Sequence, residues 1–162
     1  MNTGSGLPGE SQGVLPDVAN WSGTTAPTVA FGQGYSVTAM QATSIFATIA
    51  NDGIRVSPTV IAGTSDSDGH FTPAKSRESV RVISSSTASD MRLMMESVVS
   101  AQGTAPEAAI PGYRVAGKTG TAQRVDETCG CYRGYTASFI GFAPADKPRY
   151  VVNVTIQGPQ GD

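Results

Sequence analysis

Charged residues are scarce in this sequence of 162 residues: they make up 15% of the chain, and the formal net charge is −2. No cationic field is available, which excludes a general nucleic-acid binder. The sequence has no apolar run near the roughly 18 residues that a membrane helix requires. Residues 1–6 have neither the basic nor the apolar stretch of a signal peptide. This start is typical of an internal segment, and we expect the natural start to lie upstream.

Cysteine and histidine are also rare, with Cys129, Cys131 and His70 as the full set. Structural zinc takes four ligands, and His70 is distant in sequence from the cysteine pair, so the pair does not indicate a zinc site. Two interpretations of the pair stay open. It forms two thiols in a loop, or an i,i+2 disulfide if the compartment is oxidising.

The spacing of apolar residues predicts two helices, at 38–51 and 87–102. In the first, apolar residues recur at i, i+3, i+4, i+7 and i+8, and Thr38 with Gln41 forms a capping box. The second is predicted to begin with a cap at Thr87. Its apolar face is rich in methionine, which is typical of core packing rather than of a ligand site; these residues are Met91, Met94, Met95 and Val98.

Strand-like runs follow the helices. Two short strands are predicted at 57–61 and 80–83, with a turn cluster at 64–73 between them. Three longer strands are predicted at 113–123, 136–143 and 149–156, and the turn-rich residues 144–148 are typical of a hairpin between the last two. Helices followed by consecutive strands predict an α+β fold, with an antiparallel sheet and flanking helices.

The first 35 residues are dense in Gly, Pro, Ser and Thr. We predict an ordered loop segment here, held on the core by its few large apolar side chains, which are Leu7, Val14, Leu15, Trp21 and Phe31.

Two formal matches to functional patterns fail on their context. The nucleophile-elbow pattern at 9–13 needs a strand before it and a helix after it, but prolines flank it on both sides. The P-loop pattern at 112–119 needs a turn that opens a helix. Its central Tyr-Arg-Val-Ala alternates like a strand instead, and the residues after it carry no apolar stripe. We therefore predict no nucleotide ligand.

A third pattern, Lys118-Thr119-Gly120-Thr121, fits a strand of the serine acyltransferases that recognise penicillin. Thr119 and Thr121 lie two residues apart, so both hydroxyls face one way and can hold the carboxylate of an acyl-D-alanyl peptide or a β-lactam. Gly120 allows a substrate backbone to approach closely. Lys118 would point to the other side and supply positive potential and proton transfer. The Thr121 N–H is suited to stabilise an oxyanion.

The longer run at 115–123, Val-Ala-Gly-Lys-Thr-Gly-Thr-Ala-Gln, closely resembles the third active-site motif of class B penicillin-binding proteins. These are the monofunctional transpeptidases of septal and lateral wall synthesis, and the division-specific type is the best match. The resemblance covers nearly the whole chain in collinear order, through the segments 7–11, 31–34, 38–41, 51–53, 103–104 and 135–144.

The resemblance implies that residues 1–162 form the C-terminal portion of a transpeptidase domain. It divides the chain into a loop segment at 1–35, a helical and strand segment at 36–103, and the motif strand with its neighbours at 104–162. The family's Ser-x-x-Lys and Ser-x-Asn motifs are both missing from this sequence, and the chain stops before the family's terminal helix. We expect the nucleophile and a membrane anchor to lie outside it, and truncation to expose apolar sheet residues, namely Phe139, Phe142, Val152 and Val154.

The same resemblance implies a function for the parent protein. It would be a peptidoglycan D,D-transpeptidase that cross-links stem peptides through a serine acyl-enzyme on the extracytoplasmic face of the membrane. Lys118 would be catalytic, and Thr119, Gly120 and Thr121 would bind substrate. The implied partners are stem peptides, β-lactams, the rest of the transpeptidase domain and division-machinery proteins, with no metal or organic cofactor. The alternatives are a fragment of a serine β-lactamase, or a non-catalytic interaction module of the division machinery.

Overall fold

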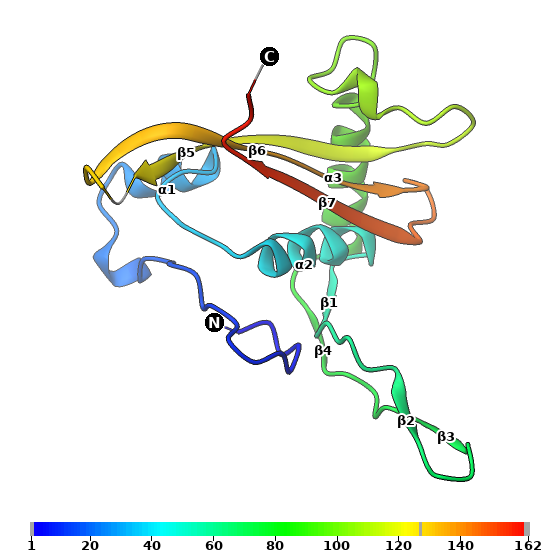
Figure 1. Cartoon of the computed structure of the whole chain (residues 1–162). Coiled ribbons are helices and arrows are strands. Elements are labelled where there is room, and N and C mark those ends of the chain that lie inside the picture. Colours follow the sequence, from blue (N-terminus) through cyan, green and yellow to red (C-terminus); the bar gives the residue numbers. More distant parts are fainter. Residues whose placement is uncertain (1, 127, 161–162) are drawn as a thin grey trace.

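Helices and antiparallel strands make up the architecture, seen in a computed structural model that describes residues 2–126 and 128–160 (Figure 1). The helices are η1 (Val18–Asn20), α1 (Thr25–Ala30), α2 (Ala39–Ala50), α3 (Ser85–Ser97) and η2 (Pro106–Ala108). The strands are β1 (Ile54–Val56), β2 (Gly63–Ser65), β3 (Phe71–Pro73), β4 (Ser79–Arg81), β5 (Ala116–Asp126), β6 (Cys131–Ala143) and β7 (Tyr150–Gln157). In these described ranges, no helix has the length and apolar character needed to cross a membrane.

The three long strands form one antiparallel sheet in the order β5-β6-β7. Helix α2 contacts β6 and β7, and α3 contacts β5 and α2. The turn at residues 144–148 joins β6 to β7 as a hairpin, as the sequence predicts. The expected α+β class, with an antiparallel sheet and flanking helices, is confirmed.

Helix α2 begins with the predicted capping box. The Thr38 hydroxyl accepts from the backbone N–H of Gln41 at 3.1 Å, and the Gln41 side chain accepts from the backbone N–H of Thr38 at 2.8 Å. Two amides that have no partner inside the helix are thereby satisfied at once. The helix ends at a turn in which Gly53 has φ +82°, and a Cβ there would lie 2.3 Å from the Ile83 carbonyl oxygen. Only glycine allows the approach that brings α2 close to the start of α3.

The core lies between the two long helices and the sheet. Phe142 of β6 is 2% exposed and is the one large side chain that is fully buried among the described residues. It packs with buried residues from both helices, from β5 and from the β6–β7 turn, which are Ile49, Met95, Ala116 and Ala145. Arg92 of α3 ties the helices together, because its guanidinium donates to the Ile49 carbonyl at 3.2 Å and to the Asp52 carboxylate at 2.8 Å.

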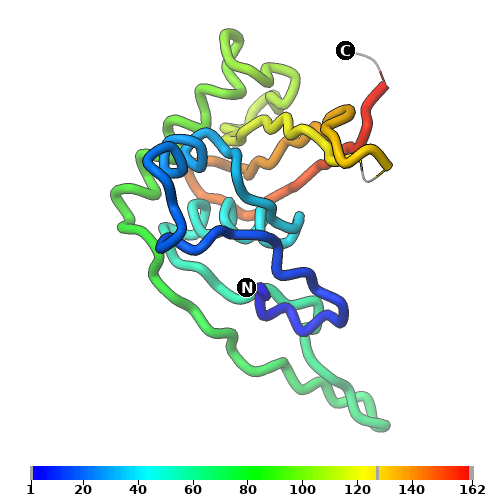
Figure 2. Tube along the Cα trace, turned by 90° about the vertical axis from the view of Figure 1, so that its left-hand side faces the viewer, coloured from blue at the N-terminus to red at the C-terminus, as the bar shows by residue number. Residues whose placement is uncertain are grey.

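The short strand predicted at 80–83 overlaps β4, whereas the short strand predicted at 57–61 and the predicted turn cluster are wrong. The predicted strand at 57–61 lies between strands, because the chain enters β1 directly after Gly53 and the Pro58 nitrogen has no proton for a ladder. The predicted turn cluster at 64–73 is largely a hairpin, in which β2 pairs with β3. Its tip is formed by the Asp66 carboxylate, which accepts from backbone amides two and four residues further on. This hairpin projects away from the sheet in both views (Figures 1 and 2).

Helix α3 begins earlier than its sequence suggests. Ser84, rather than Thr87, is the cap, because its hydroxyl accepts from the backbone N–H of Thr87 at 3.0 Å. The methionine face is also narrower than predicted. Met95 is 6% exposed, whereas Met94 is 60% exposed. A helix turns 100° per residue, so neighbouring methionines cannot both face the core.

The predicted loop segment, described from residue 2 to residue 35, is ordered but is not held in the predicted way. Of the large apolar residues expected to anchor it, only Trp21 is half-buried. The other four are exposed, namely Leu7, Val14, Leu15 and Phe31. Polar contacts hold the segment instead. Arg55 of β1 donates to the Thr3 carbonyl at 2.8 Å, and residues 14 and 36 form an isolated antiparallel bridge.

The sequence predicts that two apolar side chains on each of β6 and β7 are exposed. This is right for the two on β7 and wrong for the two on β6. Val152 and Val154 are 58% and 50% exposed, and Phe139 is intermediate, but Phe142 is the most deeply buried large residue. Phe142 points to the face that α2 and α3 cover, because it pairs with Ala116 of β5 in the buried cluster.

We expect Phe142→Ala to lower the free energy of unfolding by about 3–5 kcal/mol, because it removes a ring from a packed core and leaves a cavity. Phe71→Ala is the matched control, since Phe71 is 57% exposed on the projecting hairpin; we expect it to cost no more than about 1 kcal/mol. Urea denaturation followed by far-UV circular dichroism measures both. Equal losses in the two variants would contradict this assignment of the core.

Candidate active-site edge and its neighbours

Strand β5 pairs with β6 on one side only, so its other edge is open among the described residues. Backbone alternation shows which residues face that edge. The Tyr135 carbonyl of β6 accepts from the Gly158 amide at 2.9 Å. From Tyr135 onward, odd-numbered residues of β6 therefore direct their backbone groups to β7 and even-numbered ones to β5. Ser138 pairs with Gly120. The N–H and C=O groups of Thr119 and Thr121 therefore point to the open edge.

Lys118 folds its ammonium back over this edge. Its Nζ donates to the Thr119 carbonyl oxygen at 2.9 Å and to the Thr119 hydroxyl oxygen at 3.3 Å. The backbone places Lys118 on the opposite face from Thr119, as the sequence predicts, but the long side chain returns and joins the cation to the hydroxyl. Thr121 is exposed one step along the strand, on the same face as Thr119.

The neighbouring strand leaves no room for a side chain at Gly120. A Cβ at this position would lie 2.5 Å from the Ser138 hydroxyl oxygen on β6. The sequence suggested that glycine is needed for the approach of a substrate backbone. The structure gives a second reason, because glycine at this position leaves room for the Ser138 side chain of the paired strand β6.

The two rejected patterns lie in the structural contexts that argued against them. Residues 118–123 of the P-loop-like segment and its continuation are all in strand β5, where a P-loop would have a helix. Ser11 of the elbow-like pattern is exposed in a loop, and its hydroxyl accepts from the Gly13 amide at 3.2 Å. Neither segment has the geometry that its pattern requires.

One residue of the edge was missed as a site residue by the sequence analysis. Thr104, in the loop after α3, places its hydroxyl oxygen 3.2 Å from the hydroxyl oxygen of Thr119. Fifteen residues separate the two in sequence, so no local spacing indicates the contact. The only signal was the resemblance of Gly103-Thr104 to a family segment, which gave no role.

Among the described residues, one group could offer three ligands to a metal ion: Asp66, Asp68 and His70, whose ligand atoms lie within 4.8 Å of one another. All three are exposed at the tip of the β2–β3 hairpin, remote from β5 in Figure 1. The Asp66 carboxylate already accepts from the backbone amides of the other two. The group is thus explained by the turn that it closes.

Comparison with known proteins identifies the family. The family model described as penicillin binding protein transpeptidase domain matches residues 1–162. The chain belongs to this family. It is 46% identical to the penicillin-binding protein PbpB of Mycolicibacterium smegmatis over 99% of this chain and 26% of the relative. It is 36% identical to the peptidoglycan D,D-transpeptidase FtsI of Escherichia coli over 98% of this chain and 25% of the relative.

The fold agrees with that of a solved penicillin-binding protein. The crystal structure of penicillin-binding protein 3 from Mycobacterium tuberculosis, complexed with aztreonam, superposes with a TM-score of 0.92 at 44% identity, over 98% of this chain and 37% of that one. The chain spans about a quarter of the length of the curated relatives that it matches, 26% and 25% for the two above. It is thus a class B penicillin-binding protein segment.

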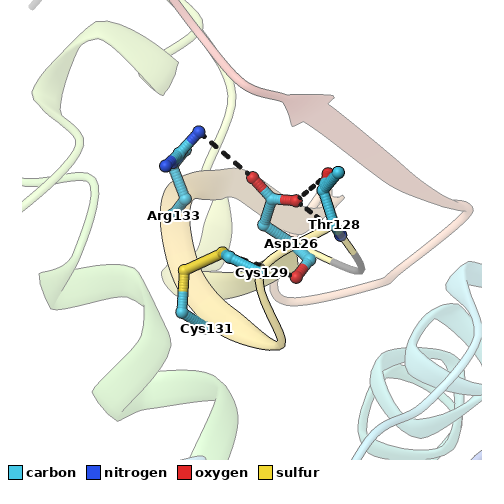
Figure 3. Close-up of a disulfide and its surroundings, with 5 residues drawn as sticks. All are labelled: Asp126, Thr128, Cys129, Cys131 and Arg133. Atoms are coloured by element: carbon cyan, nitrogen blue, oxygen red, sulfur yellow. Dashed lines mark hydrogen bonds and ion pairs between the residues drawn. A yellow bond between two sulfur atoms is a disulfide. The ribbon is translucent and has the colours of Figure 1, made fainter.

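In this penicillin-binding protein segment, a disulfide closes the tip of the β5–β6 hairpin (Figure 3). Cys129 and Cys131 are bonded, which decides between the two interpretations that the sequence left open. Beside the disulfide, the Asp126 carboxylate accepts from both the hydroxyl and the backbone N–H of Thr128, and Arg133 lies 3.5 Å from it. These contacts hold the tip in one turn.

The hydroxyl and backbone N–H of Thr128 hold the pKa of the Asp126 carboxyl below its usual range, because both donate to the charged form. This stabilisation of the turn is present above the unfolded pKa of about 3.9 and is lost as the pH falls through the lower folded pKa. We expect a carboxyl NMR titration of Asp126 to have its midpoint below about 3.9, and Thr128→Val to raise it. An Asp126 midpoint that Thr128→Val leaves unchanged would contradict this cause.

Proposed function

We propose that the protein carrying this chain is a serine-type peptidoglycan D,D-transpeptidase, and that residues 1–162 supply the C-terminal portion of its transpeptidase domain. The observation that supports this proposal is the open edge of β5. There the Lys118 ammonium, the hydroxyls of Thr119 and Thr121 and their outward-facing backbone groups lie within four residues. The name of the relative FtsI, peptidoglycan D,D-transpeptidase, supports the reaction.

The edge suits recognition of an acyl-D-alanyl end. A terminal carboxylate accepts hydrogen bonds, and the hydroxyls of Thr119 and Thr121 lie on one face to donate them. The substrate backbone would add to the open edge as a further strand, as extended peptides do on sheet edges. Lys118 would place its positive charge beside Thr119, where the carboxylate is held.

The chemistry needs a nucleophile from outside this chain. A serine there would attack the carbonyl of the penultimate D-alanine and release the terminal D-alanine, and the amine of a neighbouring stem peptide would then resolve the ester. The Thr121 N–H, which points to the open edge, would donate to the oxyanion of the tetrahedral intermediate. Lys118 would take part in proton transfer around the serine.

The same edge would accept β-lactams, which present an anionic group and a strained acyl carbonyl in the place of the peptide. The relative from M. tuberculosis is complexed with aztreonam, which supports this ligand class. We place the domain on the extracytoplasmic face of the cell membrane, in an oxidising compartment that maintains the disulfide between residues 129 and 131. A septal role, with division-machinery proteins as partners, follows from the resemblance to the division-specific type.

Lys118→Ala in the full-length protein should lower the second-order rate of β-lactam acylation by about 10²–10³-fold, because it removes the positive charge that the site presents to the anion. Lys147→Ala is the matched control, since Lys147 is exposed in the β6–β7 turn; its rate should stay within about twofold of wild type. Stopped-flow acylation with a chromogenic β-lactam measures both. A wild-type rate in Lys118→Ala would contradict the proposed role of Lys118 and of strand β5 in the active site.

The isolated chain should form no covalent adduct with penicillin, although it carries the carboxylate-binding strand. No serine in it is followed three residues later by the lysine that would accept its proton. Labelling with a fluorescent penicillin, followed by denaturing electrophoresis, tests this, with the full-length protein as the positive control. A labelled band at 16.6 kDa would place the nucleophile inside the chain and overturn the proposed division of the site.

A further inference from the structure

The hydroxyl of Thr119 has two neighbours that fix how its single proton can point. Lys118 Nζ lies 3.3 Å from Thr119 Oγ1, and Thr104 Oγ1 lies 3.2 Å from the same atom. An ammonium has protons and no lone pair, so Thr119 accepts from Lys118. A hydroxyl has one proton and two acceptor positions, so the role of Thr104 decides where the Thr119 proton goes.

Two arrangements are possible for the pair of hydroxyls. If Thr104 accepts, the Thr119 proton points back into the loop after α3 and is not available to a ligand. If Thr104 donates, both acceptor positions of Thr119 are filled by Lys118 and Thr104, and its proton is directed away from both of them. A carboxylate on the open edge has no proton to give, so it selects the second arrangement.

We propose that Thr104 is a positioning residue, which donates to Thr119 and so directs the Thr119 hydroxyl proton to the carboxylate of the bound peptide or β-lactam. The inference rests on the function proposed above. It adds to the site a residue from a different element, and it gives the loop after α3 a role in substrate recognition.

The backbone on both sides of Thr104 holds it in place. The Ala105 amide donates to the Val98 carbonyl at 2.9 Å, and the Gly103 amide donates to the Ser100 carbonyl at 2.8 Å. A Cβ on Gly103 would lie 2.1 Å from the Val98 carbonyl oxygen, so the loop can fold this tightly onto the end of α3 only with glycine. Ala105 is buried, at 9% exposure. The backbone that carries Thr104 is therefore set before a ligand arrives.

The test uses the full-length protein and a penicillin with a free carboxylate. Thr104→Val removes the hydroxyl at nearly constant size and should lower the second-order acylation rate about tenfold, the effect of losing one oriented hydrogen bond to a charged group. Thr104→Ser restores the hydroxyl and should return the rate to within about threefold of wild type. Thr64→Val, on the exposed β2 strand, is the matched control and should have no effect.

A double-mutant cycle separates this role from a structural one. If Thr104 acts through the Thr119 hydroxyl, Thr104→Val in a Thr119→Val background should change the rate by less than about twofold. Melting temperatures identify a variant that has lost its fold, and Thr104→Ala then replaces Thr104→Val with the same expected loss.

Three results would overturn the proposal: a wild-type rate in Thr104→Val, no recovery in Thr104→Ser, or an undiminished penalty in the Thr119→Val background. Failure of the proposed function has a different signature, since the wild-type protein itself would then not be acylated.

Discussion

In the part of the chain that the structure describes, strand β5 has a partner on one side only, and the candidate site depends on this constraint. The ladder with β6 takes up the backbone groups of Lys118 and Gly120, so those of Thr119 and Thr121 are left for the open edge. An open edge is a risk in most sheets because it can pair with any extended chain. Here the backbone groups that the β6 ladder does not use suit a peptide substrate, and the threonine hydroxyls beside them give the edge a preference for a terminal carboxylate. Recognition is therefore built from backbone direction first and side-chain identity second.

The rest of the structure keeps this edge in place. The buried cluster around Phe142 fixes β6 and β5 against the two long helices, and Arg92 joins those helices to each other. The segment that enters β5 is held by a two-bond ion pair, in which Arg114 donates to both carboxylate oxygens of Glu96 on α3 at 2.9 and 2.7 Å. This contact raises the pKa of the Arg114 guanidinium further above its usual value, because the Glu96 carboxylate accepts from it and attracts its charge. Helix α3 thus positions both the start of β5 and, through the loop after it, Thr104.

The sequence predicted an element correctly where the residues that determine it are close together along the chain. The capping box at Thr38 and Gln41 satisfies helix amides within four residues, and the three long strands alternate or pair with their immediate neighbours. Predictions failed where contacts with a distant part of the chain determine the position of a strand or the exposure of a side chain. The end of α2 passes directly into β1 because Gly53 packs on the Ile83 backbone. The strand therefore lies at 54–56 rather than at the predicted 57–61. Similarly, Val14 and Phe31 are apolar yet exposed, because Arg55 and a single bridge hold their segment through polar contacts.

The sequence by itself determined the α+β class, the order of the long strands, and the motif of Lys118, Thr119, Gly120 and Thr121 on one of them, because periodicity and spacing are properties of contiguous residues. It also carried the family, which the comparison with known proteins then showed. Only the tertiary structure decided which strand edge is open, that the Lys118 ammonium returns to Thr119, that Gly120 admits Ser138, and that Cys129 and Cys131 are bonded. It alone brought Thr104 to Thr119 across fifteen residues of sequence. Such contacts depend on how separate elements pack, and spacing along the chain does not encode that packing.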